Sequence, residues 1–335
     1  MAQHSYGIDL GTSNFKIFGL TNKKIINEKN VIAKKNKDEV FQFGDLAFEM
    51  YEKAPENIEV SFPVKFGVIA DIKNMDILFE RFFKKLNGKG ITGSSNFCIA
   101  VPTDITEVEK RAFYDMIAES RVKAKHISVV EKPIADAVGV GIDVESPRGN
   151  LIVNIGADTT EISVISLGGI VLSKLIKTGG SKLDDTICSI VRKKYNLVIG
   201  RRTAEQIKME IGSAYKVEDE KTMEIKGRDL ITGLPKTVTV TSEETEEALR
   251  EPAYQIVDAV HNVLERTPPE LAADISDRGI VLTGGGSLIQ GLEELIEEKT
   301  GINTMTAEDP LTAVAIGTGK YIEYLADDDK KSKNK

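Results

Sequence analysis

The sequence predicts an α/β protein made of two related halves, and three observations support this fold class. Its 335 residues exceed the usual size of a single domain. Runs typical of strands alternate with runs typical of helices, as in largely parallel sheets covered on both faces. Two stretches of similar sequence, 6–20 and 151–172, each have the pattern of strand, tight turn and strand. This internal repeat predicts a duplicated domain.

The turns within the two repeated stretches are candidate phosphate-binding loops. When the stretches are overlaid, Asp9 corresponds to Asn154 and Gly11 to Gly156. Each turn supplies a glycine that can take a positive φ angle, followed by backbone N–H groups with hydroxyl side chains nearby. Such a row of amides can hold phosphate oxygens. We therefore expect the two turns to face each other across a cleft and to grip the phosphates of one nucleotide.

Composition and charge narrow the class of protein further. The formal net charge of −8 argues against a dedicated nucleic-acid-binding protein, which would carry a basic surplus. The two cysteines, Cys98 and Cys188, both lie in apolar runs, which argues against a disulfide scaffold and favours a reducing compartment. No apolar run reaches the roughly 18 residues of a membrane-spanning helix, and no basic and apolar leader precedes Tyr6. The sequence predicts a cytoplasmic protein.

In the first half, apolar residues between Met75 and Leu86 recur at helical spacing and predict an amphipathic helix with Asn74 as its N-cap. Residues 40–72 are expected to form a small, loop-rich insertion. Thr106 with Glu109 predicts a capping box at the start of a further helix. The remaining elements expected here are two buried strands, 97–101 and 127–130, and a helix that begins at Pro133.

The second half repeats this organisation. Ser181 and Thr203 are expected to cap two helices, and residues 218–241 to form a β-rich insertion. Pro252 is expected to begin a long helix. A strand over 279–283 then leads into the glycines Gly284, Gly285 and Gly286. Such a turn lets backbone approach a flat ligand and offers the N-terminus of the next helix to a polar group.

Each of these three glycine turns, taken singly, is more often a plain connection than a ligand site. In this order and spacing they resemble the phosphate-1, phosphate-2 and adenosine loops of the actin, Hsp70 and hexokinase-like superfamily. The segments GVIADIKNMDILFERFF, VEKPIADAVG, TPPELAADISDRGIVLTGGGSLIQGL and EDPLTAVAIGTG are similar to the MreB family of bacterial actins, rod shape-determining proteins. The resemblance runs from Tyr6 to about Leu325.

The resemblance implies an actin-like fold, in which two RNase-H-like domains, each with a smaller inserted subdomain, surround a central nucleotide cleft. The implied boundaries are 1–30, 73–140 and 318–335 for domain IA, 31–72 for domain IB, 141–180 and 248–317 for domain IIA, and 181–247 for domain IIB.

The implied function is that of a cytoskeletal protein that binds ATP or ADP with Mg²⁺ and polymerises into protofilaments for cell shape or movement. Co-assembly with paralogues and a place at the inner face of the membrane belong to the same expectation. Membrane contact should be weak or indirect, because the loop 88–96 offers Ile91 as its sole large apolar side chain. The basic end of the chain, 330–335, is offset by the acidic residues 327–329.

The resemblance also implies roles for individual residues. Asp9 would act on Mg²⁺ through water, and Asn154 replaces a second aspartate of the family. Thr159 matches a threonine implicated in hydrolysis. Glu205 and Lys208 match a pair beside the ribose and adenine, although without the family pattern a surface ion pair is the better interpretation. The other residues expected to contact nucleotide are Gly11, Thr12, Ser13, Asn14, Gly156, Ala157, Asp158, Gly180, Gly284, Gly285 and Gly286.

The sequence departs from the family where ATP hydrolysis is concerned. Two glutamates precede the helix proline in MreB-like sequences, and the second corresponds to the group that activates water. Here these positions are Glu131 and Lys132, and a charged lysine has no acceptor for a water proton. In one reading Glu131 takes over the role and Asp158 serves the metal in place of Asn154. A shift of one residue, however, rotates a helical side chain by about 100°. We favour the other reading, in which the chain binds ATP and hydrolyses it weakly.

Three other functions are alternatives. The first is a fully active superfamily ATPase with a substituted phosphate-2 loop, in which Glu131 and Asp158 take over the missing roles. A small-molecule kinase would need a carboxylate base and a sugar pocket, and no such stretch is evident in the sequence. An Hsp70-type chaperone would need a further substrate-binding domain.

Overall fold

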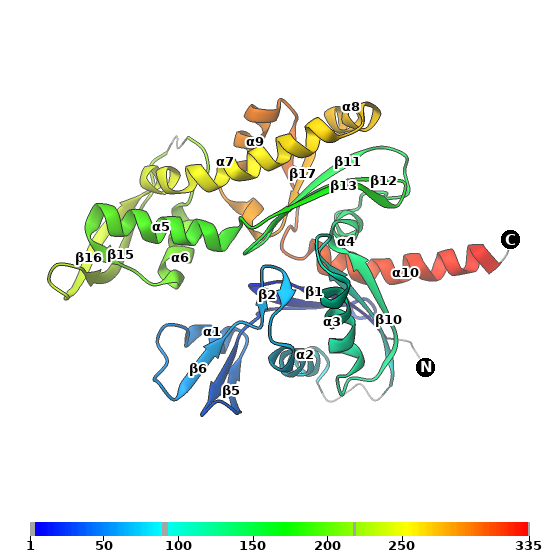
Figure 1. Ribbon diagram of the computed structural model, residues 1–335, viewed down its shortest axis with the longest axis horizontal. Helices are drawn as coiled ribbons and strands as arrows, with labels where there is room; N and C mark the ends of the chain where they lie inside the picture. Colours follow the sequence, from blue (N-terminus) through cyan, green and yellow to red (C-terminus); the bar gives the residue numbers. More distant parts are fainter. Residues whose placement is uncertain (1–3, 89–92, 217–218, 334–335) are drawn as a thin grey trace. The chain divides into compact units, whose positions relative to one another are not determined.

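The computed structural model describes residues 4–88, 93–216 and 219–333, and it divides into two compact units (Figure 1). Unit 1 comprises Met1–Pro147, Ile165–Ile170 and Leu311–Lys335, and unit 2 comprises Arg148–Val164 and Val171–Pro310. Each unit is built on a five-stranded sheet of its own, as the internal repeat predicts. The four-part division into domains IA, IB, IIA and IIB stays a prediction.

The sheet of unit 1 is mixed rather than largely parallel. Its strand order is β10-β9-β1-β2-β3, in which β1 pairs with β9 and β9 with β10 in parallel. The pairs β1–β2 and β2–β3 are antiparallel, because a short hairpin joins each of them. The strands are β1 (Ser5–Leu10), β2 (Asn14–Gly19), β3 (Lys24–Lys29), β9 (Ser95–Val101) and β10 (Ala124–Glu131).

Helices cover both faces of this sheet. One face packs against α2 (Ile72–Asn87) and α3 (Glu107–Ala118), with Phe79 and Phe82 buried against β1 and β2. The opposite face packs against α4 (Lys132–Gly139) and α10 (Ala313–Lys333). There α10 lies so close to β1 that a Cβ atom on Gly7 would meet the backbone nitrogen of Gly319 at 2.2 Å. The core therefore fixes the carboxyl ends of β1 and β10.

Two helix starts in unit 1 test the capping predictions. The N-cap of α2 is Asp71, whose carboxylate accepts from the Asn74 N–H at 3.0 Å, so the prediction of Asn74 as N-cap was wrong. Asp71, three residues earlier, is an equally good capping residue, and the helix begins there. The capping box of α3 is confirmed, since Thr106 and Glu109 exchange both hydrogen bonds.

The insertion after β3 contains more strand than its sequence predicts. A three-stranded sheet of order β5-β4-β6 and a small cluster around Val31, Ala33 and Ala47 give it a separate core. Its elements are β4 (Ile32–Lys35), β5 (Glu39–Phe43), α1 (Asp45–Glu49), β6 (Ile58–Ser61), β7 (Val64–Lys65) and β8 (Val68–Ile69). Ile91, the apolar residue considered for membrane contact, lies outside the described residues.

The sheet of unit 2 has the order β13-β12-β11-β17-β18. Its core joins β11 and β17 to the buried face of α7 through Val153, Leu282 and Val257. Leu167 and Gly168, both with positive φ, join β12 and β13 as a two-residue hairpin turn. The elements are β11 (Asn150–Ile155), β12 (Thr160–Ser166), β13 (Gly169–Ile176), α8 (Pro269–Arg278), β17 (Ile280–Thr283), the 3₁₀ helix η1 (Gly285–Leu288), α9 (Leu292–Thr300) and β18 (Thr304–Thr306).

The β-rich insertion of the second half is confirmed as the hairpin β15 (Thr222–Asp229) and β16 (Pro235–Thr241), with β14 (Leu197–Val198) at its edge. It packs on α5 (Gly180–Tyr195), α6 (Arg201–Ile211) and the start of α7. The predicted caps of α5 and α6, Ser181 and Thr203, were wrong. Both helices begin earlier in the chain, with Gly179 and Gly200 as their N-caps.

The long helix α7 (Ser242–Arg266) begins before Pro252, so the predicted start was wrong as well. A capping box formed by Thr241 and Glu244 begins the helix, and the buried stripe through Leu249 and Ala253 continues across the proline. Packing along the whole stripe therefore outweighs the hydrogen bond that the proline removes. Neither Cys98 nor Cys188 takes part in a disulfide. Among the described residues, no helix combines the length and the apolar character needed to cross a bilayer.

Candidate functional site

The turn between β1 and β2 is closed by a hydrogen bond from the Gly11 N–H to the Asn14 carbonyl at 3.0 Å. A Cβ atom on Gly11 would lie 2.8 Å from that same oxygen. Neither Gly11 nor Gly156 of the second turn has a positive φ, so the conformational reason predicted for these glycines was wrong. Glycine is needed at Gly11 because the turn brings backbone too close for a side chain.

Asn30, fully buried, holds the carbonyl groups of this turn. Its side-chain amide donates to the Gly11 carbonyl at 2.9 Å, and its backbone N–H donates to the Ser13 carbonyl at 2.8 Å. Within the described part of the chain, the backbone N–H groups of Thr12 and Ser13 have no acceptor. The turn therefore has the carbonyls of Gly11, Ser13 and Asn14 occupied and two adjacent amides available, an arrangement that binds anions.

Two lysines surround the carboxylate of Asp9 at the end of β1. The Lys16 ammonium lies 2.8 Å from Oδ2, and the Lys132 ammonium lies 3.2 Å from Oδ1. Lys16 is directly opposite Asp9 in the register of the β1–β2 hairpin. Lys132 reaches the carboxylate from the first position of α4, across β9, where the small residue Ala100 is the pairing partner of Asp9.

The two lysines determine whether the Asp9 carboxyl is ionised. Asp9 is only 4% exposed, and burial opposes its charged form. The ammonium groups of Lys132 and Lys16 outweigh that effect and hold the pKa of Asp9 well below its ordinary range. The Asp9 carboxylate is therefore ionised at neutral pH, with a positive group on each oxygen.

Glu131, the last residue of β10, lies in a different environment from its neighbour Lys132. Its side chain is 47% exposed and its carboxylate is 3.8 Å from the Lys110 ammonium of α3. The Lys132 side chain is only 15% exposed. The position that contacts Asp9 is thus occupied by the lysine, and the glutamate is at the surface beside α3.

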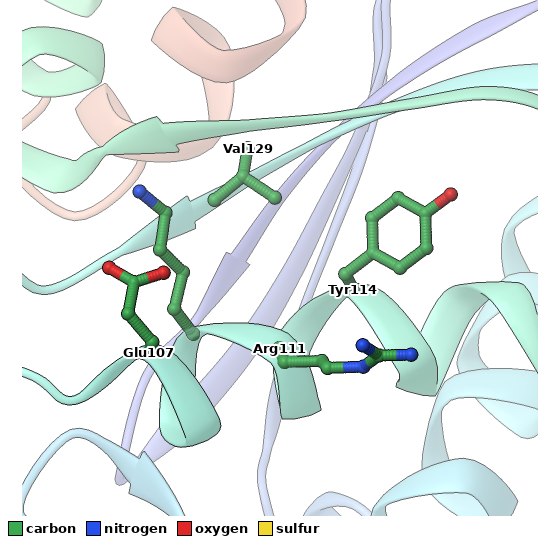
Figure 2. A pocket seen from close by; sticks show the side chains of 5 residues that line it. Glu107, Arg111, Tyr114 and Val129 are labelled. Carbon is green, nitrogen blue, oxygen red and sulfur yellow. The ribbon is translucent and has the colours of Figure 1, made fainter.

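A surface depression of about 530 Å³ lies next to the Glu131–Lys110 pair. It is lined by Glu107, Lys110, Arg111 and Tyr114 of α3 and by Val129 of β10. Figure 2 shows the α3 side chains beneath the strand that carries Val129. None of the residues predicted to contact nucleotide lines it, so it is separate from the candidate site.

The turn between β11 and β12 in unit 2 repeats the hydrogen bond of the first turn. The Gly156 N–H donates to the Thr159 carbonyl at 2.8 Å. Its own carbonyl and that of Ala157 accept from the first amides of α5, those of Gly180 and Ser181, at 3.0 and 2.7 Å. Within the residues that the structure covers, the N–H groups of Ala157 and Thr159 have no acceptor. This turn also presents amides while the carbonyls of Gly156, Ala157 and Thr159 are occupied.

The polar side chains of the second turn differ from those of the first. Asn154, at the position corresponding to Asp9, carries no charge. The carboxylate of Asp158 accepts from the Ser181 hydroxyl at 2.8 Å, so it is tied to the start of α5. Thr159 contributes its carbonyl to the turn, and the next residue, Thr160, is fully buried with its hydroxyl on the Thr178 carbonyl at 2.7 Å.

The third glycine turn packs directly on β11. Gly284 has φ 77° and ψ 164°, a region that only glycine occupies readily. A Cβ atom there would lie 2.4 Å from the Ile155 carbonyl, and one on Gly286 would lie 2.3 Å from the Ile155 side chain. Close packing therefore explains two of the three glycines without a ligand.

Lys208, in the last turn of α6, links that helix to the start of α5. Its ammonium is 2.7 Å from the Asp184 carboxylate of α5 and 3.1 Å from the Gly180 carbonyl. Burial raises the pKa of the Asp184 carboxyl, and Lys208 offsets part of this effect. The partly buried pair Lys208–Asp184 is thus a structural link, and Glu205 lies one turn earlier on the same helix.

The donor groups do not fit a magnesium ion held by the protein. In the described residues, no group of three or more His, Cys, Asp or Glu side chains is arranged to hold a metal. Mg²⁺ requires oxygen ligands in an octahedron, and protein sites usually supply one or two carboxylates. Both oxygens of Asp9 already contact ammonium groups, and Asn154 carries no charge.

Sequence reasoning missed several residues that shape the site. Lys16 was detectable, because a hairpin closed at Gly11 and Asn14 places it opposite Asp9. Asn30 carried no such signal, since its contact with the turn depends on the path of the chain after β3. Of the predicted residues, the structure brings Asp9 and Lys132 together in unit 1, and Gly156, Ala157 and Gly180 together in unit 2.

Two α/β units, each with a hairpin turn of the same construction, define an actin-like protein. The solved structure of MreB5 of Spiroplasma citri bound to AMPPNP matches with a TM-score of 0.93 and 34% identity, over 99% of both chains. The MamK double helical filament structure shares the fold with a TM-score of 0.82 at 22% identity, over 96% of this chain and 99% of that one.

Sequence comparison gives the family. The profile described as MreB/Mbl protein matches residues 3–330. The chain is 42% identical to the cell shape-determining protein Mbl of Bacillus subtilis (strain 168) over 326 residues, 97% of each chain. It is 40% identical to the cell shape-determining protein MreB of Escherichia coli (strain K12) over 331 residues, 97% of this chain and 95% of that protein. The chain belongs to the MreB/Mbl family, which confirms the resemblance.

Proposed function

We propose that this chain is a cytoskeletal protein that binds an adenine nucleotide, assembles into filaments and hydrolyses ATP slowly. The observation that carries the nucleotide proposal is the pair of matching turns, each with three of its carbonyls occupied and two backbone amides that have no acceptor among the described residues. The Spiroplasma citri relative, solved with AMPPNP and with ADP, supports the same ligand class. The MamK filament shows that a protein of this fold can assemble, which supports the filament proposal. At 22% identity it supports no more than that.

The case for slow hydrolysis rests on Lys132. An ATPase needs an acceptor that orients the attacking water, and an ammonium group donates only. Glu131 is poorly placed to substitute, because its carboxylate is exposed and paired with Lys110. Asp158 is likewise committed to the Ser181 hydroxyl. The site thus supports nucleotide binding better than it supports the chemical step.

Filament formation is tested by sedimentation. Purified full-length protein is centrifuged at high speed after incubation with ATP, with ADP or without nucleotide. The proposal predicts a nucleotide-dependent pellet that contains filaments by electron microscopy. Protein that binds nucleotide and stays in the supernatant under all conditions would contradict the filament proposal, and ATP consumption that requires a sugar or acetate would favour the kinase alternative.

Hydrolysis is tested by phosphate release. The wild-type chain should release phosphate very slowly, and Lys132→Glu combined with Asn154→Asp should raise the rate by about a hundredfold or more, the lower end of the usual scale for a general base. Arg111→Glu, an exposed α3 residue with the same change of charge as Lys132→Glu, serves as the control. A wild-type rate equal to that of an ordinary bacterial actin would contradict slow hydrolysis, and equally slow release by the two proteins would contradict the assignment to Lys132 and Asn154.

Two finer expectations belong to the same proposal and depend on partners. Co-assembly with a paralogue that hydrolyses ATP faster would supply the turnover that this chain lacks. Contact with the inner membrane face would be weak or indirect.

A further inference from the structure

Unit 2 contains two hydrophobic cores rather than one. The first, the sheet core, joins the five-stranded sheet to α7 and α9 and includes Val153 and Val257. The second, the insertion core, lies between α5, α6, the β15–β16 hairpin and the start of α7, and includes Ile187 and Ile207. Ile289, which is only partly buried, packs against both. The insertion is therefore a body with a core of its own inside unit 2.

A small cavity of about 10 Å³ lies where the two cores meet. Leu183 and Leu249 line it from the insertion core, and Ala253 and Ile256 line it from the sheet core. Close packing normally holds neighbouring elements in one arrangement, and a void leaves the side chains around it without partner atoms on one side. The boundary between the cores is thus packed less tightly at this point than a continuous core would be.

The helix α7 crosses this boundary at Pro252 and runs on along the sheet (Figure 1). Its residues Ala248 and Leu249 belong to the insertion core, and its residues Ala253 and Ile256 belong to the sheet core. Proline has no N–H, so the Ala248 carbonyl lacks its usual helical donor, and prolines are common sites of helix kinks. The helix is therefore weakest against bending where one core gives way to the other.

The helix α5 connects the insertion to the second hairpin turn. The N–H groups of Gly180 and Ser181 donate to the carbonyls of Gly156 and Ala157, and the Ser181 hydroxyl donates to the Asp158 carboxylate. The later turns of the same helix are buried in the insertion core. Since a helix is a rigid element, a displacement of the turn is carried along α5 into the insertion.

We propose that the insertion core, residues 180–211 and 222–249, pivots at Pro252 relative to the sheet core, and that α5 links this movement to occupancy of the second turn. This inference rests on the proposed nucleotide binding and names a conformational change that the nucleotide would control. The competing explanation is that Pro252 and the cavity are packing irregularities within one rigid body. In that case nucleotide would bind without moving the insertion.

The first test measures the distance between nitroxide labels on Thr237→Cys in β16 and Ser276→Cys in α8, by double electron–electron resonance. Both positions are exposed, and the full chain carries Cys188→Ser so that the partly buried thiol is not labelled. Labelled protein is diluted with unlabelled protein, so that distances between copies do not contribute. Saturating ATP with Mg²⁺ should shift the mean distance by about 2 Å or more.

The two possible failures are separated by isothermal titration calorimetry on the same protein. An unchanged distance distribution with ATP bound would overturn the inference and leave nucleotide binding intact. Absence of ATP binding would instead overturn the proposed function.

A second label pair tests the role of α5. Lys193, exposed in the last turn of α5, is labelled in place of Thr237. Because α5 belongs to the moving body, the distance from this position to Ser276 should also shift when ATP binds. A shift at Thr237 without one at Lys193 would show that the hairpin moves alone, and would overturn the link through α5.

The third test assigns the pivot to Pro252. Pro252→Ala restores the missing N–H and should stiffen α7, so it should remove most of the ATP-dependent shift. Alanine is favourable within a helix, so the variant should fold. The matched control is Pro269→Ala, at the first position of α8, where no helical donor is missing, and it should keep the wild-type shift. A wild-type shift in Pro252→Ala would overturn the pivot.

Affinity gives an independent measurement of the same coupling. If binding drives the movement, resistance to the movement must weaken binding. ATP should therefore bind Pro252→Ala more weakly than wild type by about fivefold or more, and should bind Pro269→Ala as it binds wild type. Equal dissociation constants for Pro252→Ala and wild type would show that the movement and the nucleotide are not coupled.

Discussion

The two hairpin turns share a backbone and differ in charge. In unit 1 the Gly11 N–H donates to the carbonyl three residues later, and in unit 2 the Gly156 N–H does the same. Their supports are different, because the buried side chain of Asn30 holds the first turn and the N-terminus of α5 holds the second. The geometry of a duplicated turn can thus be kept while its surroundings change.

The charged side chains around the two turns differ more than the groups that support their backbones. Asp9 is compensated by two lysines, whereas Asn154 is neutral and the nearby acid, Asp158, is bound to a hydroxyl. Under the proposed function the two turns would therefore contribute differently to phosphate binding. Unit 1 has amides together with partly buried lysines, and unit 2 has amides beside an acid.

The largest difference between the turns should appear when each acid is neutralised. Asp9→Asn leaves two lysines without their shared counter-ion and should lower the free energy of unfolding by about 3–5 kcal/mol. Asp158→Asn should cost less than about 1 kcal/mol, because an amide still accepts from the Ser181 hydroxyl. Urea unfolding measures both changes, and equal losses would show that the two acids are equivalent.

The second turn is backed by Gly284, which supplies a further test. Gly284→Ala should destabilise the protein by about 3 kcal/mol or more, since it adds a clash with the Ile155 carbonyl to the strain of a positive φ. Gly233→Ala is the matched control, with φ +74° and no atom within 4 Å of the added Cβ, and should cost only about 1 kcal/mol. Similar losses in the two variants would remove the packing explanation for Gly284.

The support of the first turn predicts a smaller effect. Asn30→Ala leaves the Gly11 carbonyl without its donor and should cost about 1–3 kcal/mol in unfolding free energy. Asn27→Ala removes an exposed contact with the Asn14 side chain and should cost about 0.5 kcal/mol. The comparison is made by thermal unfolding. If Asn27→Ala were the more damaging change, Asn30 would have no special role in the turn.

The smallest expected difference between the two turns is in how the free energy of unfolding depends on pH. Because the folded pKa of Asp9 is below its ordinary value, its ionisation stabilises the protein above about pH 4, and this contribution is lost as the pH falls further. Asp9→Asn should therefore flatten the decline in unfolding free energy between about pH 4 and about pH 2. Asp158→Asn is the control. An unchanged acid limb in Asp9→Asn would exclude this carboxylate as a source of the decline.

Much of the fold was predictable because its signals are local or repeated. The duplicated hairpins at Gly11 and Gly156 and the capping box at Thr106 each depend on a few neighbouring residues. The start of α7 was not predictable from Pro252, because burial along the whole helix overrides the proline. The contacts of Asn30 and Lys132 depend on chain paths and register across β9, which local pattern does not encode.

The claim on which the account depends is that the Lys132 ammonium is paired with the Asp9 carboxylate. A double-mutant cycle with Asp9→Asn, Lys132→Gln and the combined variant measures their coupling in the free energy of unfolding. The account predicts a coupling energy of about 1.5 kcal/mol or more, since the Asp9 side chain is buried and that of Lys132 is mostly shielded from solvent. A coupling energy within about 0.3 kcal/mol of zero would contradict it.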